Sequence, residues 1–424
     1  MTRLAPDVGR FFTPTSWAIL ARNYIAEALK NPDWENEHYI WDCTAGTGNL
    51  LTSLKTLKNT FASTLLQEDV ETIKHRFKNT ELNQKHVFQL DILRDTIKPQ
   101  SENGKIPDNL YKIIQDDDTR RKLIIFINPP FHYTNSTKLF PEIRDANREI
   151  QLVIWYRLLK EFPNSIIASF GKIRFLTSTN YKEFRELFHV KHLGGFITVS
   201  TIFQGIKVRY PVGFMIMKND EGKSKEWCFD IISAKRKIID KKCFNYVEER
   251  LSMNRWLSKY RYYHNDVIGY FVFYRFEMHY RDLIKLMPLD AVSSKTPRYR
   301  LIPVHKYNFL PLVVAFAVIK SKPYRWYDDA DQFYAPKDGW QKDVKFIRAC
   351  IELTQKHKHN LIKNQIESLI DTISEEEETK IINRLGFIEF RIEDFVMNVT
   401  CDEDFKDNLL EYICQRASQE YYIY

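Results

Sequence analysis

The sequence predicts an α/β protein: a doubly wound, mostly parallel sheet in the first half, followed by a mixed α+β and helical region. Short apolar runs alternate with segments of helical periodicity, which is typical of strand–helix–strand units. Residues 122–127 form a nearly continuous β-branched run, as expected for a strand buried on both faces of a parallel sheet. Polar residues follow these strands at their carboxyl ends, where sheets of this kind bind ligands.

The individual elements follow in order along the first half. Residues 15–30 carry apolar side chains at helical spacing after a Thr-Pro start signal. Residues 49–57 and 70–78 also have a helical pattern. Strands are expected at residues 39–41, 62–66, 87–90, 122–127, 165–169, 193–199 and 212–217.

A change of composition predicts two domains. The charged segment 218–225 marks a boundary, which gives a first domain at residues 1–219 and a second region at residues 220–424. Residues 235–262 contain nine Lys or Arg against three Asp or Glu, interleaved with aromatic rings. The tail from about residue 343 has a helical pattern. The second region is therefore expected to face a polyanion such as DNA, with Arg255 and Arg261 among its contacts.

Overall composition narrows the class of protein. The chain has 424 residues, 44% of them apolar, and a formal charge of +8, which excludes disordered and membrane-embedded chains. The longest apolar run, residues 310–319, is too short to span a bilayer. Six cysteines without a CxxC pair argue against a zinc cage and against a disulfide scaffold. We expect a cytoplasmic protein that needs no metal and contacts no membrane.

A glycine turn after the first strand is a candidate ligand loop. Asp42 ends that strand, and Gly46 and Gly48 allow a sharp turn with close approach of the backbone to a ligand. The dinucleotide fingerprint requires a third glycine where this chain has Leu51. A plain strand-to-helix turn is the alternative interpretation of this segment taken alone.

Carboxylates near the next two strand ends favour a nucleoside ligand. Glu68 and Asp69 follow the second strand, and either could accept hydrogen bonds from a ribose diol. Asp91 follows the third strand and could accept from an adenine amino group. A single loop carboxylate is usually only solvated, but three at successive strand ends converge on one crevice.

The segment Asn128-Pro129-Pro130-Phe131 gives the sharpest signal. Two prolines cannot continue a central strand, so they fix an extended turn at the sheet edge. The Asn128 side-chain oxygen and the Pro129 carbonyl are neighbouring acceptors, which suits an exocyclic amino group with two N–H donors. Phe131 could stack on the ring that carries the amine.

Together these motifs resemble an S-adenosylmethionine-dependent DNA methyltransferase. The resemblance is to the N6-adenine type with cofactor motifs first and target recognition last, as found in restriction-modification systems. It implies the class I methyltransferase fold and covers about residues 9–217. The matching segments are Gly9 to Pro14, Asp42 to Gly48, Asp91, Asn128 to Phe131, Phe175 to Arg185 and Phe203 to Lys207.

The resemblance also implies roles for these residues. The cofactor would lie against Phe12, Thr13, Pro14, Asp42, Gly46, Gly48, Glu68 or Asp69, Asp91 and Asn128, with Thr13 near its carboxylate. Asn128, Pro129, Pro130 and Phe131 would form the catalytic corner. Phe131, Phe203 and Lys207 would surround an adenine flipped out of double-stranded DNA. A cognate restriction endonuclease is the expected protein partner.

Three other functions remain open on the sequence. The same Asn-Pro-Pro element would serve a methyltransferase acting on a protein glutamine amide, because the amide nitrogen also carries two N–H donors that need acceptors. Methylation of an RNA base is a second alternative. A non-catalytic DNA-binding specificity protein is the third, against which the intact catalytic and cofactor motifs weigh.

Overall fold

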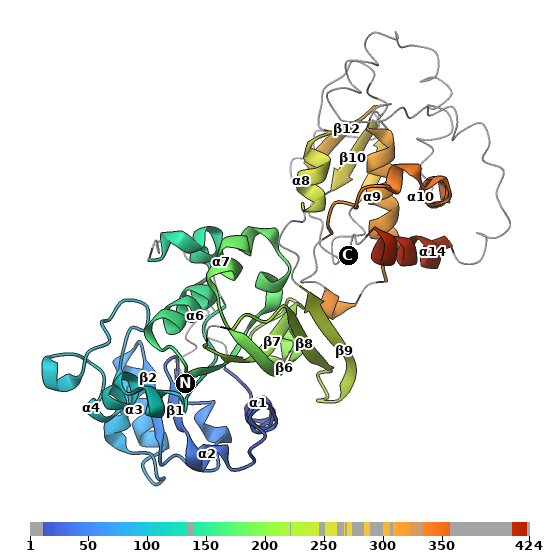
Figure 1. Cartoon of the computed structure of the whole chain (residues 1–424). Coiled ribbons are helices and arrows are strands. Elements are labelled where there is room, and N and C mark those ends of the chain that lie inside the picture. Colours follow the sequence, from blue (N-terminus) through green and yellow to red (C-terminus); the bar gives the residue numbers. More distant parts are fainter. Residues whose placement is uncertain are drawn as a thin grey trace, which may run out of the picture. The chain divides into compact units, whose positions relative to one another are not determined.

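The computed structural model describes most of the chain. The described residues are 12–131, 133, 139–220, 222–245, 251–260, 267, 269–273, 284–288, 300–305, 308–323, 325–328, 333–356 and 409–421. They divide into two compact units, Met1–Glu248 and Glu249–Tyr424, coloured from blue to olive and from yellow to red in Figure 1.

The first unit is built on a nine-stranded sheet of order β3-β2-β1-β4-β5-β7-β6-β8-β9. Strands β3, β2, β1, β4 and β5 are parallel, β7 runs antiparallel to its neighbours, and β6 and β8 are parallel to one another. The doubly wound, mostly parallel sheet predicted from the sequence is therefore confirmed. The strands are β1 (Tyr39–Asp42), β2 (Thr60–Thr64), β3 (Val87–Gln89), β4 (Leu123–Ile127), β5 (Ile166–Lys172), β6 (Lys191–Val199), β7 (Pro211–Lys218), β8 (Glu226–Ile232) and β9 (Ile238–Asn245).

Helices cover both faces of this sheet. On one face, Trp17 of α1 packs in a cluster with Phe126 and Phe196. On the other, Trp155 of α6 donates a 2.9 Å hydrogen bond to Ser169 of β5. The alternation of side chains along each strand supplies both apolar faces. The helices are α1 (Thr15–Leu29), α2 (Trp34–Glu37), α3 (Gln67–Arg76), α4 (Asp108–Gln115), α5 (Asp117–Arg120), α6 (Ile150–Glu161) and α7 (Lys182–Leu187).

The helix expected at residues 49–57 is wrong. That segment contains only a short 3-10 turn, Leu51–Ser53. The Thr52 and Ser53 hydroxyls donate to the carbonyls of Asn49 and Leu50, which competes with helical bonding. Glu35 then accepts a 2.6 Å hydrogen bond from the backbone of Lys55 and draws the chain out of the turn.

The domain boundary also differs from the expected one after residue 219. The compact units divide between residues 248 and 249, because β8 and β9 extend the sheet of the first unit. The charged segment before β8 is a connection between two strands of that sheet. Part of the basic stretch that begins at residue 235 therefore belongs to the first unit.

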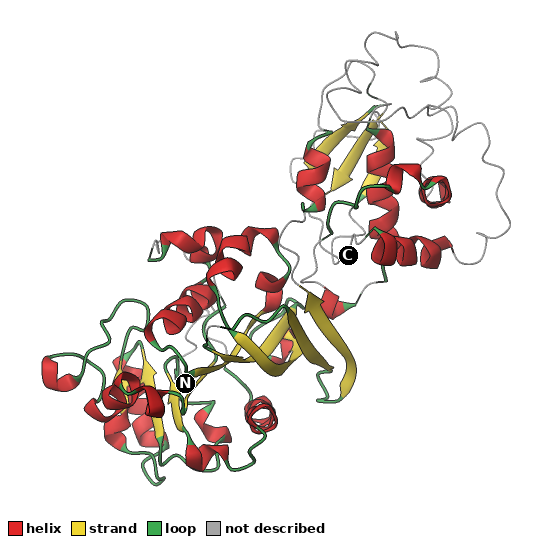
Figure 2. Cartoon of the chain, in the orientation of Figure 1, coloured by secondary structure: helices red, strands yellow, loops and turns green. Residues whose placement is uncertain are grey.

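The second unit has an α+β core. A three-stranded antiparallel sheet of order β11-β10-β12 packs with α8, α9 and α10 in one apolar cluster (Figure 2). Nearly every side chain of α9 is buried. None of the helices in the described residues combines the length and the hydrophobicity that a membrane span requires. The elements are α8 (Met253–Ser258), β10 (Gly269–Phe273), β11 (Lys285–Pro288), β12 (Arg300–Val304), α9 (Phe309–Ser321), α10 (Val344–Lys356) and α14 (Leu409–Gln415).

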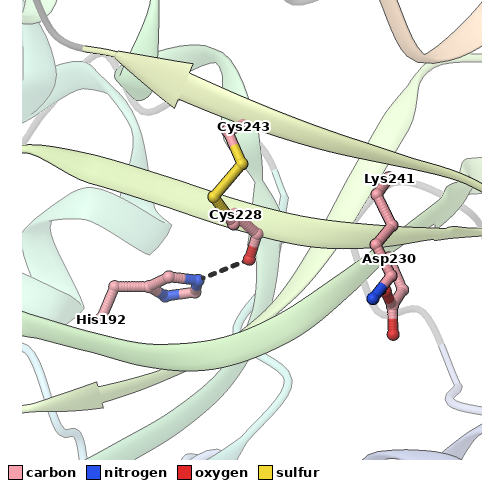
Figure 3. The surroundings of a disulfide bond; sticks show 5 residues. All are labelled: His192, Cys228, Asp230, Lys241 and Cys243. Atoms are coloured by element: carbon pink, nitrogen blue, oxygen red, sulfur yellow. Dashed lines mark hydrogen bonds and ion pairs between the residues drawn. A yellow bond between two sulfur atoms is a disulfide. The ribbon is translucent and has the colours of Figure 1, made fainter.

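Two cysteines form a disulfide that the sequence analysis did not anticipate. Cys228 and Cys243 lie directly opposite one another on the antiparallel strands β8 and β9, and their sulfurs are bonded (Figure 3). Glu226 lies within reach of the same two sulfurs, but both thiols are consumed by the disulfide. A separation of 15 residues does not reveal this pair, because strand register brings the two together.

Candidate active site at the carboxyl edge of the sheet

The glycine turn and the proline corner lie at one edge of the sheet. β1 and β4 are adjacent parallel strands, with Trp41 opposite Ile125, so Asp42 and Asn128 follow at neighbouring strand ends. In open α/β sheets, ligands bind beside the carboxyl ends of the strands where the strand order reverses, and β1 and β4 flank that point here. Both sequence motifs therefore open onto the same edge.

Asp42 is a buried carboxyl at the end of β1. It is 1% exposed and accepts a 3.1 Å hydrogen bond from the backbone N–H of Thr44. Burial raises the pKa of Asp42 to about 7, and the hydrogen bonds from Thr44 oppose that rise. Because this carboxyl faces its own turn, its direct effect is to hold the shape of the glycine loop.

The two glycines of the turn have different roles. Gly46 (φ +52°) and Gly48 (φ +80°) both adopt the left-handed backbone that favours glycine. A Cβ at Gly48 would lie 2.9 Å from Phe77 and 3.3 Å from Ile73, so this glycine lets the turn pack on α3. A Cβ at Gly46 would meet no atom of the described residues within 4 Å, so packing within them does not require this glycine.

The segment before α1 reaches the proline corner. The Asn128 side-chain amide donates a 2.8 Å hydrogen bond to the hydroxyl of Thr13, 115 residues away in the sequence. Thr13 is 3% exposed, whereas its neighbour Phe12 is 43% exposed. This hydrogen bond fixes the orientation of the Asn128 amide at the end of β4. Gly9, Arg10 and Phe11 of the same motif lie outside the described residues.

Two candidate stacking rings pack on one another. Phe131 and Phe203 are 6% and 1% exposed, and their rings meet edge to face with centroids 5.7 Å apart. Phe203 makes a similar contact with Phe170 of β5. Pro129 is buried and Pro130 half-buried between Asn128 and Phe131. The segment 128–131 thus packs on an aromatic cluster through Phe131.

The three candidate nucleoside-binding carboxylates differ in exposure. Glu68 and Asp69 lie in the first turn of α3, with Glu68 exposed. Asp69 is 5% exposed and accepts a 3.4 Å hydrogen bond from Thr64 at the end of β2. Asp91 is half-buried after β3 and accepts a 2.9 Å bond from the Leu93 backbone. Glu68 is the one whose side chain projects into solvent.

The candidate DNA contacts are distributed over both units. Lys207 is exposed in the loop between β6 and β7 of the first unit. Arg255 lies in α8 of the second unit. Arg261 lies outside the described residues, as do His264 and the whole basic and aromatic segment 274–281, which includes His279.

A polar cluster around the buried Glu149 was not singled out from the sequence. Glu149 is 3% exposed and accepts a hydrogen bond from the hydroxyl of Tyr181. Tyr133 forms a backbone bridge with Glu149, and the ammonium of Lys172, at the end of β5, lies 4.7 Å from the Tyr133 ring. Burial lowers the pKa of Lys172, while Glu149 opposes that change. Only tertiary structure assembles these residues, since no spacing links them.

Comparisons with known proteins give fold-level resemblances. No protein-family model matches the sequence, and no curated protein sequence matches it either. Its structure is similar to the DrdV–DNA complex (13% identity, TM-score 0.39, 55% of this chain and 30% of that chain). It is also similar to a Listeria monocytogenes protein described as a class I S-adenosylmethionine-dependent methyltransferase (15%, 0.38, 55% and 68%).

A third similar structure is the methyltransferase subunit of a type I restriction-modification system from Streptococcus thermophilus (13% identity, TM-score 0.37, 56% of this chain and 50% of that chain). The chain thus spans half or less of the length of the first and third of these proteins.

Proposed function

We propose that this protein is an S-adenosylmethionine-dependent DNA methyltransferase that modifies the N6 amino group of adenine, as the modification component of a restriction-modification system. The observation that carries the proposal is the hydrogen bond between Thr13 and Asn128 at the strand end beside the glycine turn. The hydrogen bond links two motifs that are far apart in the sequence, and the pairing of β1 with β4 brings the start of the glycine turn to the neighbouring strand end.

The residues at this edge fit the proposed cofactor. Among the described residues, no atom would lie within 4 Å of a Cβ at Gly46, so none of them blocks the approach of a ligand to that backbone. Thr13 and Asn128 would supply polar groups at the neighbouring strand end, and Glu68 would supply an exposed carboxylate for a diol. When bound, S-adenosylmethionine supplies an electrophilic methyl group on a sulfonium leaving group. Asp42, Gly46 and Gly48 would shape the loop that holds it.

The proline corner has the chemistry to orient an exocyclic amine. The Asn128 side-chain oxygen and the Pro129 carbonyl can each accept one N–H of that amine. Holding both hydrogens directs the nitrogen lone pair away from the ring plane and toward the methyl group. The amide of Asn128 keeps its orientation through its hydrogen bond to Thr13. The contribution of the protein is thus orientation and exclusion of water rather than activation by a general base.

Adenine inside a duplex is out of reach of such a corner, so the base must first be extruded. Unstacking costs about a few kcal/mol, and stacking on an aromatic ring returns about 1–3 kcal/mol. Phe131, at 6% exposed, is the ring of the corner that would take this role, whereas Phe203, which was expected beside the adenine, is 1% exposed and packs in the core against Phe131. A basic second region with Arg255 would contact the duplex outside the site.

Transfer of tritium from labelled S-adenosylmethionine tests the proposal. We expect label in DNA that lacks adenine methylation, and none in RNA or in protein. Asn128→Ala should lose at least about 100-fold in transfer, since the oriented acceptor is gone. It should still bind labelled cofactor in equilibrium dialysis, because the glycine loop is unchanged.

Asn36→Ala is the matched control, because Asn36 is an exposed asparagine in α2. Its transfer rate should equal that of the unmodified chain. Label in RNA would favour the RNA-base alternative, and label in a protein with an exposed glutamine would favour the amide alternative. Full transfer by Asn128→Ala would contradict the proposed role of the corner.

A further inference from the structure

We propose that the β8–β9 hairpin tip, together with the β6–β7 loop, forms a second DNA-contacting surface that grips the phosphate backbone beside the active site. The surface is defined here as residues 207–209 and 235–237, and it is called the basic rim. The inference rests on the proposed function, since it assigns DNA contacts to the catalytic unit itself.

The basic rim lies on the same edge of the sheet as Asn128. β6 runs antiparallel to β7, which runs antiparallel to β5, so β6 is parallel to β4 and β5. β8 is parallel to β6. The carboxyl ends of β6 and β8, from which the loop and the hairpin tip depart, therefore point the same way as the end of β4.

The side chains of the basic rim are cationic and exposed. Lys207 and Arg209 flank Val208, which is 69% exposed. Residues 235–237 read Lys-Arg-Lys and are all exposed, and in the described part of the chain they form no ion pair. Ile238, which follows them, is 59% exposed. Clustered cations of this kind can neutralise backbone phosphates and release the counterions condensed on DNA, which favours association.

The backbone presents these cations outward. Arg236 has φ +60°, and its N–H donates to the Ser233 carbonyl while the Ser233 N–H donates to the Lys237 carbonyl. This tight turn ends the hairpin and projects three successive cations from it. In the other loop, Ser200 hydrogen-bonds to both Val208 and Tyr210, which closes the loop and keeps residues 207–209 at its outer side.

The spacing fits a duplex with one extruded base. Four strand steps separate β4 from β8 along the sheet, which at about 4.8 Å each is about 19 Å. That exceeds the width of the major groove, about 12 Å. When an adenine enters at Asn128, residues 235–237 of the basic rim would therefore meet the backbone across the groove rather than the extruded base. Phosphate contacts of this kind position a protein on DNA without specifying sequence.

The hairpin is anchored to the elements of the active site. Tyr24 of α1 donates a 2.7 Å hydrogen bond to Asp230 of β8, and Lys241 of β9 lies 3.7 Å from the same carboxylate. Figure 3 shows Asp230 and Lys241 on the same two strands as the Cys228–Cys243 disulfide, which cross-links β8 to β9. Because α1 also follows Thr13, one helix connects the hairpin near its tip to the segment that orients Asn128.

The test is duplex binding as a function of salt, measured by fluorescence anisotropy with a labelled duplex. The rim variant is Lys235→Gln, Arg236→Asn and Lys237→Gln, with Asn chosen because it tolerates the left-handed backbone. The control replaces Lys122, Lys191 and Lys225 by Gln. These exposed lysines precede or begin β4, β6 and β8, at the opposite edge of the sheet, and removing them changes the net charge equally.

We expect the rim variant to bind duplex at least about tenfold more weakly than the control, with a slope of log K against log salt shallower by about 2 to 3. Equal binding and equal slopes in the rim variant and the control would overturn the basic rim. Tritium transfer by the unmodified chain is measured in parallel. Rim-dependent DNA binding without any methyl transfer would leave the basic rim standing and refute the proposed function. Methyl transfer by the unmodified chain, combined with DNA binding that does not depend on the basic rim, would support the proposed function and refute the basic rim.

Discussion

The two ends of the carboxyl edge are built in opposite ways. Around β1 and β4 the functional groups are buried and held by hydrogen bonds between distant segments, as in the pair Thr13 and Asn128. Around β6 and β8 the charged groups are exposed and carried on short turns. The first end is suited to orienting a reacting group, and the second to holding a polyanion. Substitutions at the first end should therefore cost stability or catalysis, whereas those at the second should cost only DNA binding.

The largest effect is expected from Gly48→Ala. A Cβ there would lie 2.9 Å from Phe77 on a backbone with φ +80°, so strain and overpacking add to about 2–5 kcal/mol of lost stability. Gly46→Ala is the matched control, because it has the strain without the clash and should lose about 1–2 kcal/mol. Thermal unfolding of both variants checks the order. Equal melting temperatures would show that the turn does not pack on α3 as described.

A smaller effect is expected from Asp42→Asn, and it depends on pH. Because the pKa of Asp42 in the folded chain is raised to about 7, the protonated carboxyl contributes stability that is fully present below the unfolded pKa of 3.8. That contribution is lost as the pH rises through about 7. The variant lacks this titration, so its stability relative to the unmodified chain should rise by about 2–3 kcal/mol between about pH 5 and about pH 8.

Urea unfolding at both pH values measures that change. Any constant cost of replacing the carboxyl by an amide cancels in the comparison. A difference in stability that stays the same across this range would mean that Asp42 ionises as an ordinary carboxyl.

The smallest effect is expected from Thr13→Ala. The variant removes the acceptor of the Asn128 amide, and the loss of one hydrogen bond should slow methyl transfer by about tenfold. Thr13→Ser keeps the hydroxyl and should retain most of the rate. Steady-state kinetics on DNA would separate the two. If serine and alanine behaved alike, the methyl group of Thr13 rather than its hydroxyl would be responsible.

The sequence predicted the parallel part of the sheet better than the two strands, β8 and β9, that extend it at one end. The strand expected at residues 122–127 is confirmed as β4. A short, continuous apolar run between polar ends is typical of a strand that is buried on both faces of a parallel sheet. β8 and β9 were not expected. Five of the eight side chains of β9 are exposed, and three of the eight are charged. An edge strand of this kind has no apolar alternation to detect.

The site was predictable as a set of motifs but not as an arrangement. Asn128 and Gly46 stand out by residue type, and the order of the strands brings them to one edge. The pairing of Thr13 with Asn128 depends on where α1 packs, and the cluster around Glu149 depends on α6 and β5. Contacts of this kind arise from tertiary packing over long sequence separations, which local patterns do not encode.

The most direct test of the central claim is the identity of the modified base. DNA from a host without adenine methylation, expressing either the unmodified chain or Asn128→Ala, would be digested to nucleosides and measured by mass spectrometry. N6-methyladenine in the first sample and none in the second is the result that an amine-orienting corner at Asn128 predicts. Equal amounts of N6-methyladenine in both samples, or a methylated base other than adenine in the first, would contradict it.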